Sequence, residues 1–592
     1  MGFLSTLIPI LKGTDLSTFR VSVNGTTLKD KYSVSAITVN RTVNKIPCAE
    51  LILLDGDVSE QIYEASDSET FVPGAKVKIL MGYSQNEKTI FEGIIIKHSI
   101  QLQQGKPTVL IVDLKDEAVK LTVGRKNKFF EKKKDSVIIE EVLAGFKGDV
   151  DATDTEHEEM VQYFCTDWDF VLSRAEVNSM LAFVDKGKVS FKKPNLAAKP
   201  KTSAVFANNV YEFEAEMDAR DEYKDVEASS WDDSKREVIK KKGKKPVGET
   251  KLPEKDAGKP DADTLAGVIG LSEFALQHSG QIKDTELEAW ATAKLLRSRM
   301  SKIRGRAKIE GYNEIKPGEM IGIDQFSKRF NGAAFVSGVT HHLSADSAYY
   351  TEIQFGFAQD WFSRKYTDIV EQPASGLLPS VYGLQVGIVK KITEDPDNDF
   401  RVKVNLPMVK VGEEGVWARL ANLDAGKERG SFFYPEVGDE VIVGFMNDDP
   451  RQPIILGMLY SKNADGKPPL EPTTDNFKKG FFTREKIKLE FDDEKKSVLI
   501  ETPGGNKIFV TDDDDPEITL EDSNSNKISM TKDGIEITSS KDLKIKATGD
   551  ITMEGVNISI AADSQFKAEG SSGVEMSSSA TAVLKGSIVQ IN

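Results

Sequence analysis

A repeating pattern of apolar pairs near the C-terminus constrains the fold of this chain more than any other feature. Two apolar residues separated by one residue recur every ten positions and then every eight, at Val498/Ile500, Ile508/Val510, Ile518/Leu520, Ile528/Met530, Ile535/Ile537, Leu543/Ile545, Ile551/Met553, Ile558/Ile560, Phe566/Ala568, Val574/Met576 and Ala582/Leu584. A fixed period of this kind marks an internal repeat. A separation of two residues places both apolar side chains on the same face of a β-strand.

The repeat predicts an assembly of three chains. A single strand with two apolar side chains buries very little surface. If three identical chains wind about one axis, each layer combines three such pairs into a triangular core, and neighbouring strands cover the edges. We therefore expect a C-terminal trimeric intertwined β-helix, a narrow prism. A disordered Ser-rich tail does not explain the sustained period, and repeats this short leave too few strands per turn for a single-chain β-helix.

The N-terminal residues Phe3–Leu11 are apolar, but no basic residue precedes them and they contain Pro9. Because a small-residue cleavage signature is also missing, we interpret them as a docking segment and not as a signal peptide. No later stretch reaches the ~20 apolar residues that a membrane span needs.

Most of the first 370 residues are typical of a mainly β fold with α+β character. Short alternating apolar and polar runs over residues 17–115 predict a small barrel or sandwich, and strand-like runs resume over residues 306–357. Thr166–Asp169 and Thr285–Glu288 read as capping boxes that begin two helices. Residues 235–264, rich in Lys and Pro, are expected to form a mobile linker or surface loop. A basic patch for nucleic acid is the rival interpretation, but it lacks interleaved aromatic residues.

Residues 380–462 predict a second compact all-β unit. Five short strands are expected at Val386–Ile392, Phe400–Leu406, Val416–Leu420, Glu440–Phe445 and Pro453–Gly457. Five strands in so short a segment indicate a small closed barrel of the OB-fold type.

Composition limits the possible partners and the redox environment. The chain carries 78 basic and 94 acidic residues, for a net charge of -16. This balance argues against a nucleic-acid partner and against an acidic membrane surface. Cys48 and Cys165 lie far apart in sequence, so they predict neither a disulfide framework nor a thiolate zinc site. A reducing compartment is consistent with this, at least during assembly.

Motifs for catalysis or metal binding are largely missing from the sequence. His157-Glu-Glu-Met160 begins like a zinc-protease motif, but Val161 occupies the place of the second histidine. His341 and His342 are adjacent in a strand-like run, so we expect one packed and one solvated imidazole. Asp512–Asp515 is interpreted as a solvated bend. If three copies formed a ring of negative charge there, calcium would stabilise it, which melting the trimer with and without calcium would test.

Several sequence segments resemble one known family. Pro435–Phe445 followed by Asp449–Gly457 resembles the OB-fold signature of VgrG spikes, the spike proteins of contractile injection systems. Tyr163–Arg174 and Ile315–Glu319 resemble the hub half of the same family. The segments occur in the family's order, and the resemblance spans nearly all 592 residues. Members of this family serve type VI secretion systems, extracellular injection particles and phage tails, and the sequence does not distinguish between these three machines.

The resemblance implies a division of the chain and a function. It implies a phage-hub-like domain with two barrels over 1–370, an OB-fold domain over 376–465 and a β-helical needle over 466–592. The trimer would adapt a hexameric inner tube to a threefold needle and puncture a target membrane. Baseplate proteins, a PAAR-type cap and effectors are the other implied partners. The protein would assemble in the bacterial cytoplasm and leave it on firing.

The resemblance also assigns the tip of the needle. The needle is expected to end bluntly without an effector domain, and the implied cap-binding residues are Ile588, Val589, Gln590, Ile591 and Asn592.

Two departures from related needles argue against an enzyme and against a cofactor. Only about 25 residues separate Leu459 from Phe482 and Ile487, too few for the lysozyme domain that some phage needles carry. The last histidine is His342, so no paired histidines could bind iron at the tip. The alternatives are a trimeric tail-fibre or glycan-binding spike, which would need aromatic platforms, and a glycan hydrolase, which would need two carboxylates in one cleft.

Overall fold

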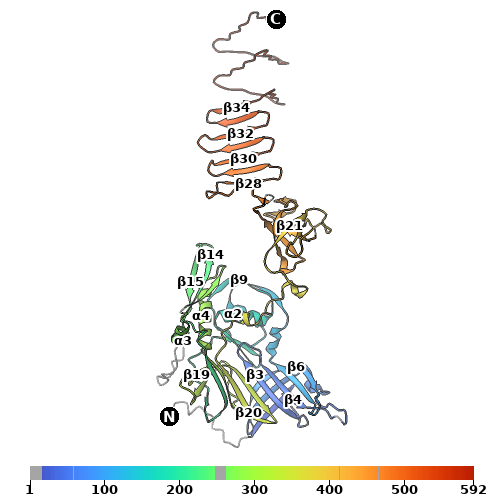
Figure 1. Cartoon of the computed structure of the whole chain (residues 1–592), viewed down its shortest axis with the longest axis vertical. Coiled ribbons are helices and arrows are strands. Elements are labelled where there is room, and N and C mark those ends of the chain that lie inside the picture. Colours follow the sequence, from blue (N-terminus) through green and yellow to red (C-terminus); the bar gives the residue numbers. More distant parts are fainter. Residues whose placement is uncertain are drawn as a thin grey trace. The chain divides into compact units, whose positions relative to one another are not determined.

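The structure is a computed structural model that describes residues 16–57, 59–246, 262–271, 273–412, 414–463 and 466–591. The fold is mainly β (Figure 1). The chain divides into two compact units. The first comprises the described residues up to Val381 together with Asn447–Pro450, and the second comprises Tyr382–Met446 with the described residues from Arg451 onward. The N-terminal segment Phe3–Leu11, predicted to dock, lies outside the described residues.

A thirteen-stranded sheet forms most of the first unit. Its first half consists of β1 (Ser17–Val23), β2 (Thr26–Thr27), β3 (Val34–Thr42), β4 (Cys48–Leu54), β5 (Lys76–Tyr83), β6 (Asn86–Gln101) and β7 (Val109–Lys115). Its second half consists of β12 (Thr202–Val205), β13 (Val210–Met217), β17 (Ile303–Glu310), β18 (Met320–Asp324), β19 (Gly332–Ser344) and β20 (Ser347–Phe355). The halves join where β3 pairs with β19, and each has its own apolar core.

A helical segment with its own core lies between these halves in sequence. It contains β8 (Lys126–Lys134), α1 (Asp135–Val142), β9 (Glu156–Cys165), α2 (Asp167–Val177), β10 (Leu181–Asp185) and β11 (Lys188–Lys192). The predicted capping box at the start of α2 is confirmed, because the Thr166 hydroxyl accepts a hydrogen bond from the Asp169 amide at 3.1 Å. The unit also contains four short helices, η1 (Glu69–Phe71), η2 (Glu117–Thr122), α5 (Phe362–Lys365) and η3 (Pro373–Gly376).

The second predicted capping box is wrong. Helix α4 (Asp284–Ser301) begins one residue earlier than expected, and its N-cap residue Lys283 makes no side-chain cap. The Thr285 hydroxyl instead accepts a hydrogen bond from the Thr155 hydroxyl at 2.8 Å. A tertiary contact therefore replaces the local one.

The expected mobile linker at 235–264 is partly wrong as well. Strand β15 (Glu237–Lys242) pairs with β14 (Asp225–Asp232), which pairs in turn with β16 (Glu273–His278), and α3 (Ala262–Ile269) follows β15 in sequence. The lysines of β15 each contact a carboxylate, Lys240 to Glu227 at 2.8 Å and Lys242 to Glu273 at 2.6 Å. These ion pairs order a composition that looks disordered in isolation. Residues 247–261 lie outside the described residues.

The predicted five-stranded barrel is confirmed in the second unit. It is closed, in the order β21 (Gln385–Lys391), β22 (Val402–Asn405), β23 (Val416–Leu420), β27 (Pro453–Met458) and β26 (Glu440–Phe445). A small hairpin, β24 (Ala425–Gly426) and β25 (Arg429–Gly430), and the short helix η4 (Met446–Asp448) lie between its strands in sequence.

A seven-stranded antiparallel sheet follows the barrel in sequence. Each strand pairs with the next along the chain, through β28 (Lys478–Phe482), β29 (Lys488–Asp492), β30 (Ser497–Glu501), β31 (Lys507–Thr511), β32 (Glu517–Glu521), β33 (Lys527–Thr531) and β34 (Gly534–Thr538). Among the described helices of the whole chain, none is both long and apolar enough to cross a bilayer.

Candidate functional site

The apolar face of the C-terminal sheet is the candidate functional site. The cross-strand register aligns apolar residues in two columns, the first from β28 to β34 and the second from β29 to β34, and most of them are the predicted pairs. The first column is Phe481, Leu489, Ile500, Ile508, Leu520, Ile528 and Ile537, and the second is Phe491, Val498, Val510, Ile518, Met530 and Ile535. Directly opposed side chains on one face of an antiparallel pair are the unit of sheet stabilisation.

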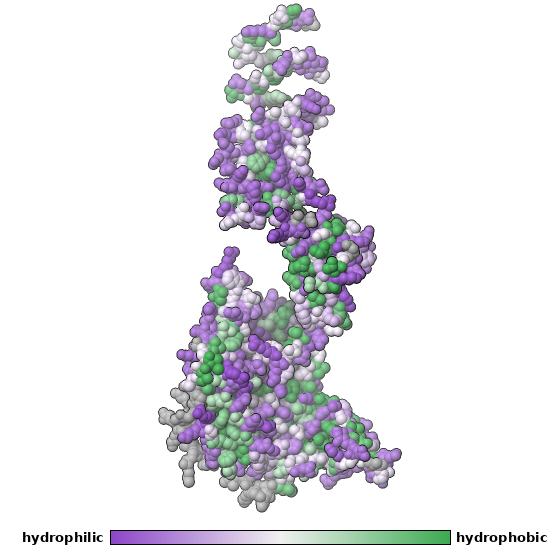
Figure 2. All heavy atoms as spheres, viewed as in Figure 1, coloured by the Kyte–Doolittle hydropathy of each residue, from purple (hydrophilic) through white to green (hydrophobic). Residues whose placement is uncertain are grey.

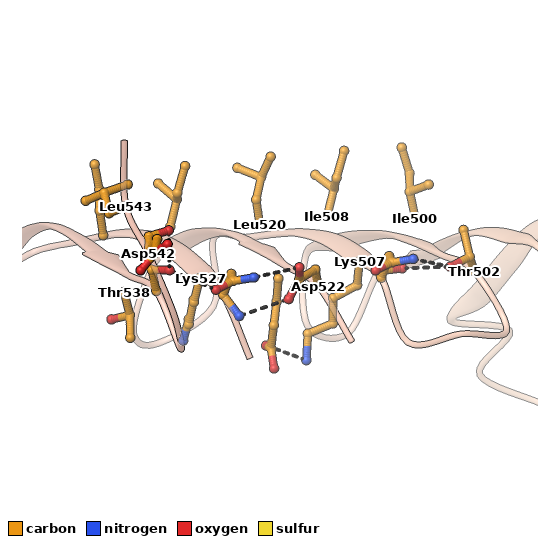
Figure 3. Close-up of a pocket in the computed structure, with 16 residues that line it drawn as sticks. Ile500, Thr502, Lys507, Ile508, Leu520, Asp522, Lys527, Thr538, Asp542 and Leu543 are labelled. Carbon is orange, nitrogen blue, oxygen red and sulfur yellow. Dashed lines mark hydrogen bonds and ion pairs between the residues drawn. The ribbon is translucent and has the colours of Figure 1, made fainter. Parts of the chain in front are cut away.

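The two columns stay partly uncovered within one chain. Ile508, Leu520 and Met530 keep about 40% of their surface exposed. Figure 3 shows Ile500, Ile508, Leu520 and Leu543 pointing to the same side, so the first column continues past the last strand into the tail. Covering the exposed part of each such side chain contributes ~1 kcal/mol. A contiguous apolar face of this length marks an interaction surface.

The opposite face of the sheet is mainly polar, with Leu499 and Phe509 as apolar residues, and carries a column of alternating charge. Lys488, Glu501, Lys507, Glu521 and Lys527 lie opposite one another in register. Lys488 contacts Glu501 at 2.7 Å, and Lys507 contacts Glu521 at 2.9 Å. The sheet therefore has one polar face and one apolar face.

We expect the Glu521→Lys substitution to destabilise the sheet by about 1 kcal/mol per chain, because it places three cations next to one another in the column. The matched control is Glu517→Lys, on the same strand and face but opposite Thr511. The loss of stability, measured by the urea midpoint, should shrink in 1 M salt for Glu521→Lys only. Equal losses for both variants would show that the column contributes nothing.

Asparagine side chains connect successive turns along one edge of the sheet. The Asn506 side-chain oxygen accepts a hydrogen bond from the Ser523 amide at 3.1 Å, and that of Asn526 accepts one from the Ser540 amide at 3.0 Å. The Asn526 side chain also donates to Asp522, and its hydrogen bonds lower the pKa of that carboxyl to about 2. Asn526 thus joins the last turns of the sheet to the start of the tail.

The period of the repeat changes where the strands end. The ten-residue repeat forms β30–β33, whereas the eight-residue repeat has no strand in the described residues after Thr538. Every residue from 541 to 591 is exposed. An extended segment with exposed apolar pairs and without strand partners of its own leaves its backbone groups to be paired by another chain.

The predicted tip residues lie in this exposed segment. Ile588 and Ile591 keep 82% and 86% of their surface exposed, and Val589 keeps 52%. Asn592 lies outside the described residues. Cap binding by these residues stays a prediction.

The residues considered for metal binding have structural roles instead. His157 lies in a buried polar cluster, where its Nε2 is 3.1 Å from the Asp135 carboxylate. Arg174 donates two hydrogen bonds to the same carboxylate, at 2.7 and 2.9 Å. Asp512–Asp515 is an exposed bend in which Asp515 pairs with Lys532 at 3.0 Å. Within the described ranges, no group of three or more potential ligands is placed to bind a metal ion.

The prediction for the adjacent histidines is confirmed for the packed one. His341 is fully buried, and the hydroxyl of Tyr349 lies 2.9 Å from its Nδ1. His342 is half-buried and its Nδ1 lies 3.0 Å from the Thr38 hydroxyl. Burial, with a smaller contribution from the charge of Arg41, lowers the pKa of His341 to about 3.

We expect His341 to make the first unit sensitive to acid. Between pH 6.5 and 3 the unfolded chain binds a proton at this position and the folded chain does not, so stability is lost as the pH falls. From pH 7 to pH 5 the loss is about 2 kcal/mol. Hydrogen exchange of β19, corrected for intrinsic rates, should show this loss in the native chain and not in His341→Asn. An identical pH dependence of exchange in the native chain and in His341→Asn would contradict this role of His341.

Comparisons with known proteins agree with this architecture. The Alg8 N-terminal domain model matches residues 13–345. The type VI secretion system/phage-baseplate injector OB domain matches 385–460, and the phage baseplate V C-terminal trimerisation domain matches 497–592. The first model alone covers more than half of the chain.

Curated relatives match a small part of the chain. The spike protein VgrG3 of Vibrio cholerae is 46% identical over 68 residues, 11% of this chain and 7% of the relative. VgrG5 of Pseudomonas aeruginosa is 29% identical over 123 residues, 20% of this chain and 15% of the relative. A Vibrio cholerae relative named actin cross-linking toxin VgrG1 is 38% identical over 77 residues, 12% of this chain and 7% of its own length.

Two solved structures are similar across most of the chain. The Escherichia coli c3393 protein, a type VI secretion component, covers 74% of this chain and 99% of its own length at 14% identity, with a TM-score of 0.36. The Francisella PdpA-VgrG complex covers 89% of this chain and 80% of its own at 10% identity, with a TM-score of 0.38.

The chain belongs to the Alg8 N-terminal domain family and is a VgrG-type spike protein of contractile injection systems. The trimerisation model lies over β30–β34 and the tail, and it supports a homotrimer.

The first members of the two columns were not among the predicted apolar pairs. Phe481, Leu489 and Phe491 belong to the apolar face, yet they fall outside the ten-residue period. The pair Leu489/Phe491 is spaced like the others and was the signal that could have found them.

Proposed function

We propose that three copies of the chain form the hub and spike of a contractile injection system. The trimer adapts a hexameric inner tube to a threefold needle, and the needle punctures the target membrane. The observation that carries the proposal is the uncovered apolar face of β28–β34, which continues into an exposed tail with the same apolar pairs. The match to a trimerisation domain over the same residues supports it.

The function is mechanical. Three sheets that share one apolar core form a stiff prism, because each strand is hydrogen-bonded to its neighbours and the connecting turns are short. Intertwining of the three tails, residues 541–591, would pair the backbone groups that one chain leaves free. Force from sheath contraction would then reach the needle without any covalent chemistry.

We assign the regions of the chain accordingly. Residues 1–370 form the hub with two barrels, 376–465 the OB-fold domain and 466–592 the needle. The hub would contact the tube and baseplate proteins. Residues 588–592 would bind a PAAR-type cap, which carries effectors. The protein would assemble in the bacterial cytoplasm and be expelled on firing.

We propose that the chain is not an enzyme. Two of the three family models that match it describe a baseplate injector OB domain and a baseplate trimerisation domain. The relative named as a toxin matches over only 7% of its own length. A glycan-binding spike is less well supported, because the only aromatic residue after Phe509 is Phe566.

Deletion of the gene from the bacterium that encodes it tests the proposal. Without the chain, electron microscopy of the cells or their medium should show no complete tube-and-sheath particles, and the native gene should restore them. Particles that assemble and deliver their cargo without the chain would refute the proposed function.

The cap-binding tip has a separate test. Removing residues 588–592 should abolish co-purification of a PAAR-type protein encoded in the same genome, because the exposed apolar tip is lost. The shortened protein should still be a trimer by light scattering. Unaltered co-purification would place the cap elsewhere on the chain.

A further inference from the structure

The first apolar column of the sheet extends beyond the sheet into the barrel. Phe481 of β28 lies opposite Leu489, so it is the first member of the column. The ring of Phe433 stacks on the ring of Phe481, with centroids 5.6 Å apart and an interplanar angle of 18°. Phe433 comes from the barrel loop between β25 and β26. Because the two rings touch, the barrel loop continues the apolar face.

Both rings remain open on one side within a single chain. Phe433 keeps 54% of its surface exposed and Phe481 keeps 52%. An ion pair between Arg484 and Glu436, at 3.1 Å, connects the same loop to the residues after β28. Figure 2 shows hydrophobic residues gathered on one side of the barrel. About half of each ring is still open to further apolar contact.

We propose that the trimer interface begins at Phe433 and Phe481, and that the second and third copies of the chain cover both rings. This inference rests on the proposed homotrimer. The occupant is another copy because Phe481 is in register with a column that runs to Ile537 and Phe433 stacks on Phe481, and the trimerisation match covers the later part of that column.

The arrangement gives the barrel loop a role in the needle. Six rings from three copies would close the base of the prism core. Each barrel is then held to the core by side-chain packing in addition to the chain that leads from β27 to β28. Phe433 is a positioning residue in this arrangement, since it fixes the barrel relative to the needle.

Photo-crosslinking tests the proposal in the full-length chain. Benzoylphenylalanine replaces the residue at one position, as Phe433→benzoylphenylalanine, and the purified protein is irradiated. The matched control carries the same replacement at Leu456, which is 49% exposed on barrel strand β27. If Phe433→benzoylphenylalanine prevents folding, the replacement is made at Phe481, the other ring of the pair.

The expected result is denaturing-gel bands at two and three chain masses for position 433 and only one chain mass for position 456. If the native protein is a trimer by light scattering but position 433 yields no such bands, the inference is wrong and the proposed function stands. If the native protein has the mass of one chain, the proposed function itself fails. Equal crosslinking at both positions would show that the contact is not specific to the ring pair and would also overturn the inference.

Discussion

Replacing Leu520 with aspartate is expected to convert the trimer into single chains. Leu520 lies in the middle of the first apolar column, between Ile508 and Ile528. In a threefold core the substitution places three carboxylates in one layer. Each unpaired buried charge costs several kcal/mol, and the lost leucine adds about 2–5 kcal/mol. Because all three chains carry the substitution in the same layer, these costs are incurred three times in one trimer.

Light scattering of the purified Leu520→Asp chain measures the outcome. The matched control is Ser523→Asp, which adds the same carboxylate three residues away on the exposed turn after β32. The control should remain a trimer. If Leu520→Asp is a trimer with unchanged thermal stability, the apolar columns do not form the core between chains.

Replacing Arg174 with alanine is expected to destabilise the helical part of the first unit by about 3–5 kcal/mol. Its guanidinium donates two hydrogen bonds to Asp135 and one to Glu286 at 2.7 Å. Asp135 is buried, and burial by itself raises the pKa of a carboxyl. Hydrogen bonds from His157 and Arg174 nevertheless hold the pKa of Asp135 well below its usual range. Without Arg174, the buried carboxyl of Asp135 loses two hydrogen bonds and its cationic partner.

Arg220→Ala is the matched control for Arg174→Ala. Arg220 also donates two guanidinium hydrogen bonds to one aspartate, Asp218, but its side chain is 80% exposed. Because solvent screens an exposed pair of this kind, we expect Arg220→Ala to leave the stability nearly unchanged. Hydrogen exchange of α2 measures both variants. Similar losses of protection would mean that burial does not determine the strength of the cluster.

Short-range patterns in the sequence predicted the second unit well. The five barrel strands lie within two residues of their predicted ends, because alternation and turn residues are local signals. The apolar pairs from Val498 to Met530 fall on β30–β33 as expected. The ten-residue period did not predict that these strands pair within one chain. The same alternation is compatible with a partner strand from the same chain and with one from another chain.

Long-range contacts determine the features that the sequence did not predict. Strand β15 is ordered by carboxylates on β14 and β16, and Thr285 is engaged by Thr155, 130 residues earlier. Phe481 joins the apolar column only because the turn between β28 and β29 sets its register, and Phe433 only through the fold of the barrel loop. None of these contacts is visible in a local pattern.

The mass of the purified full-length chain, measured by light scattering at micromolar concentration, tests the central claim most directly. The account predicts three times the mass of one chain, because neither the columns of β28–β34 nor the tail pairs can be covered by the chain itself. A stable mass of one chain, with residues 541–591 resistant to protease, would contradict it.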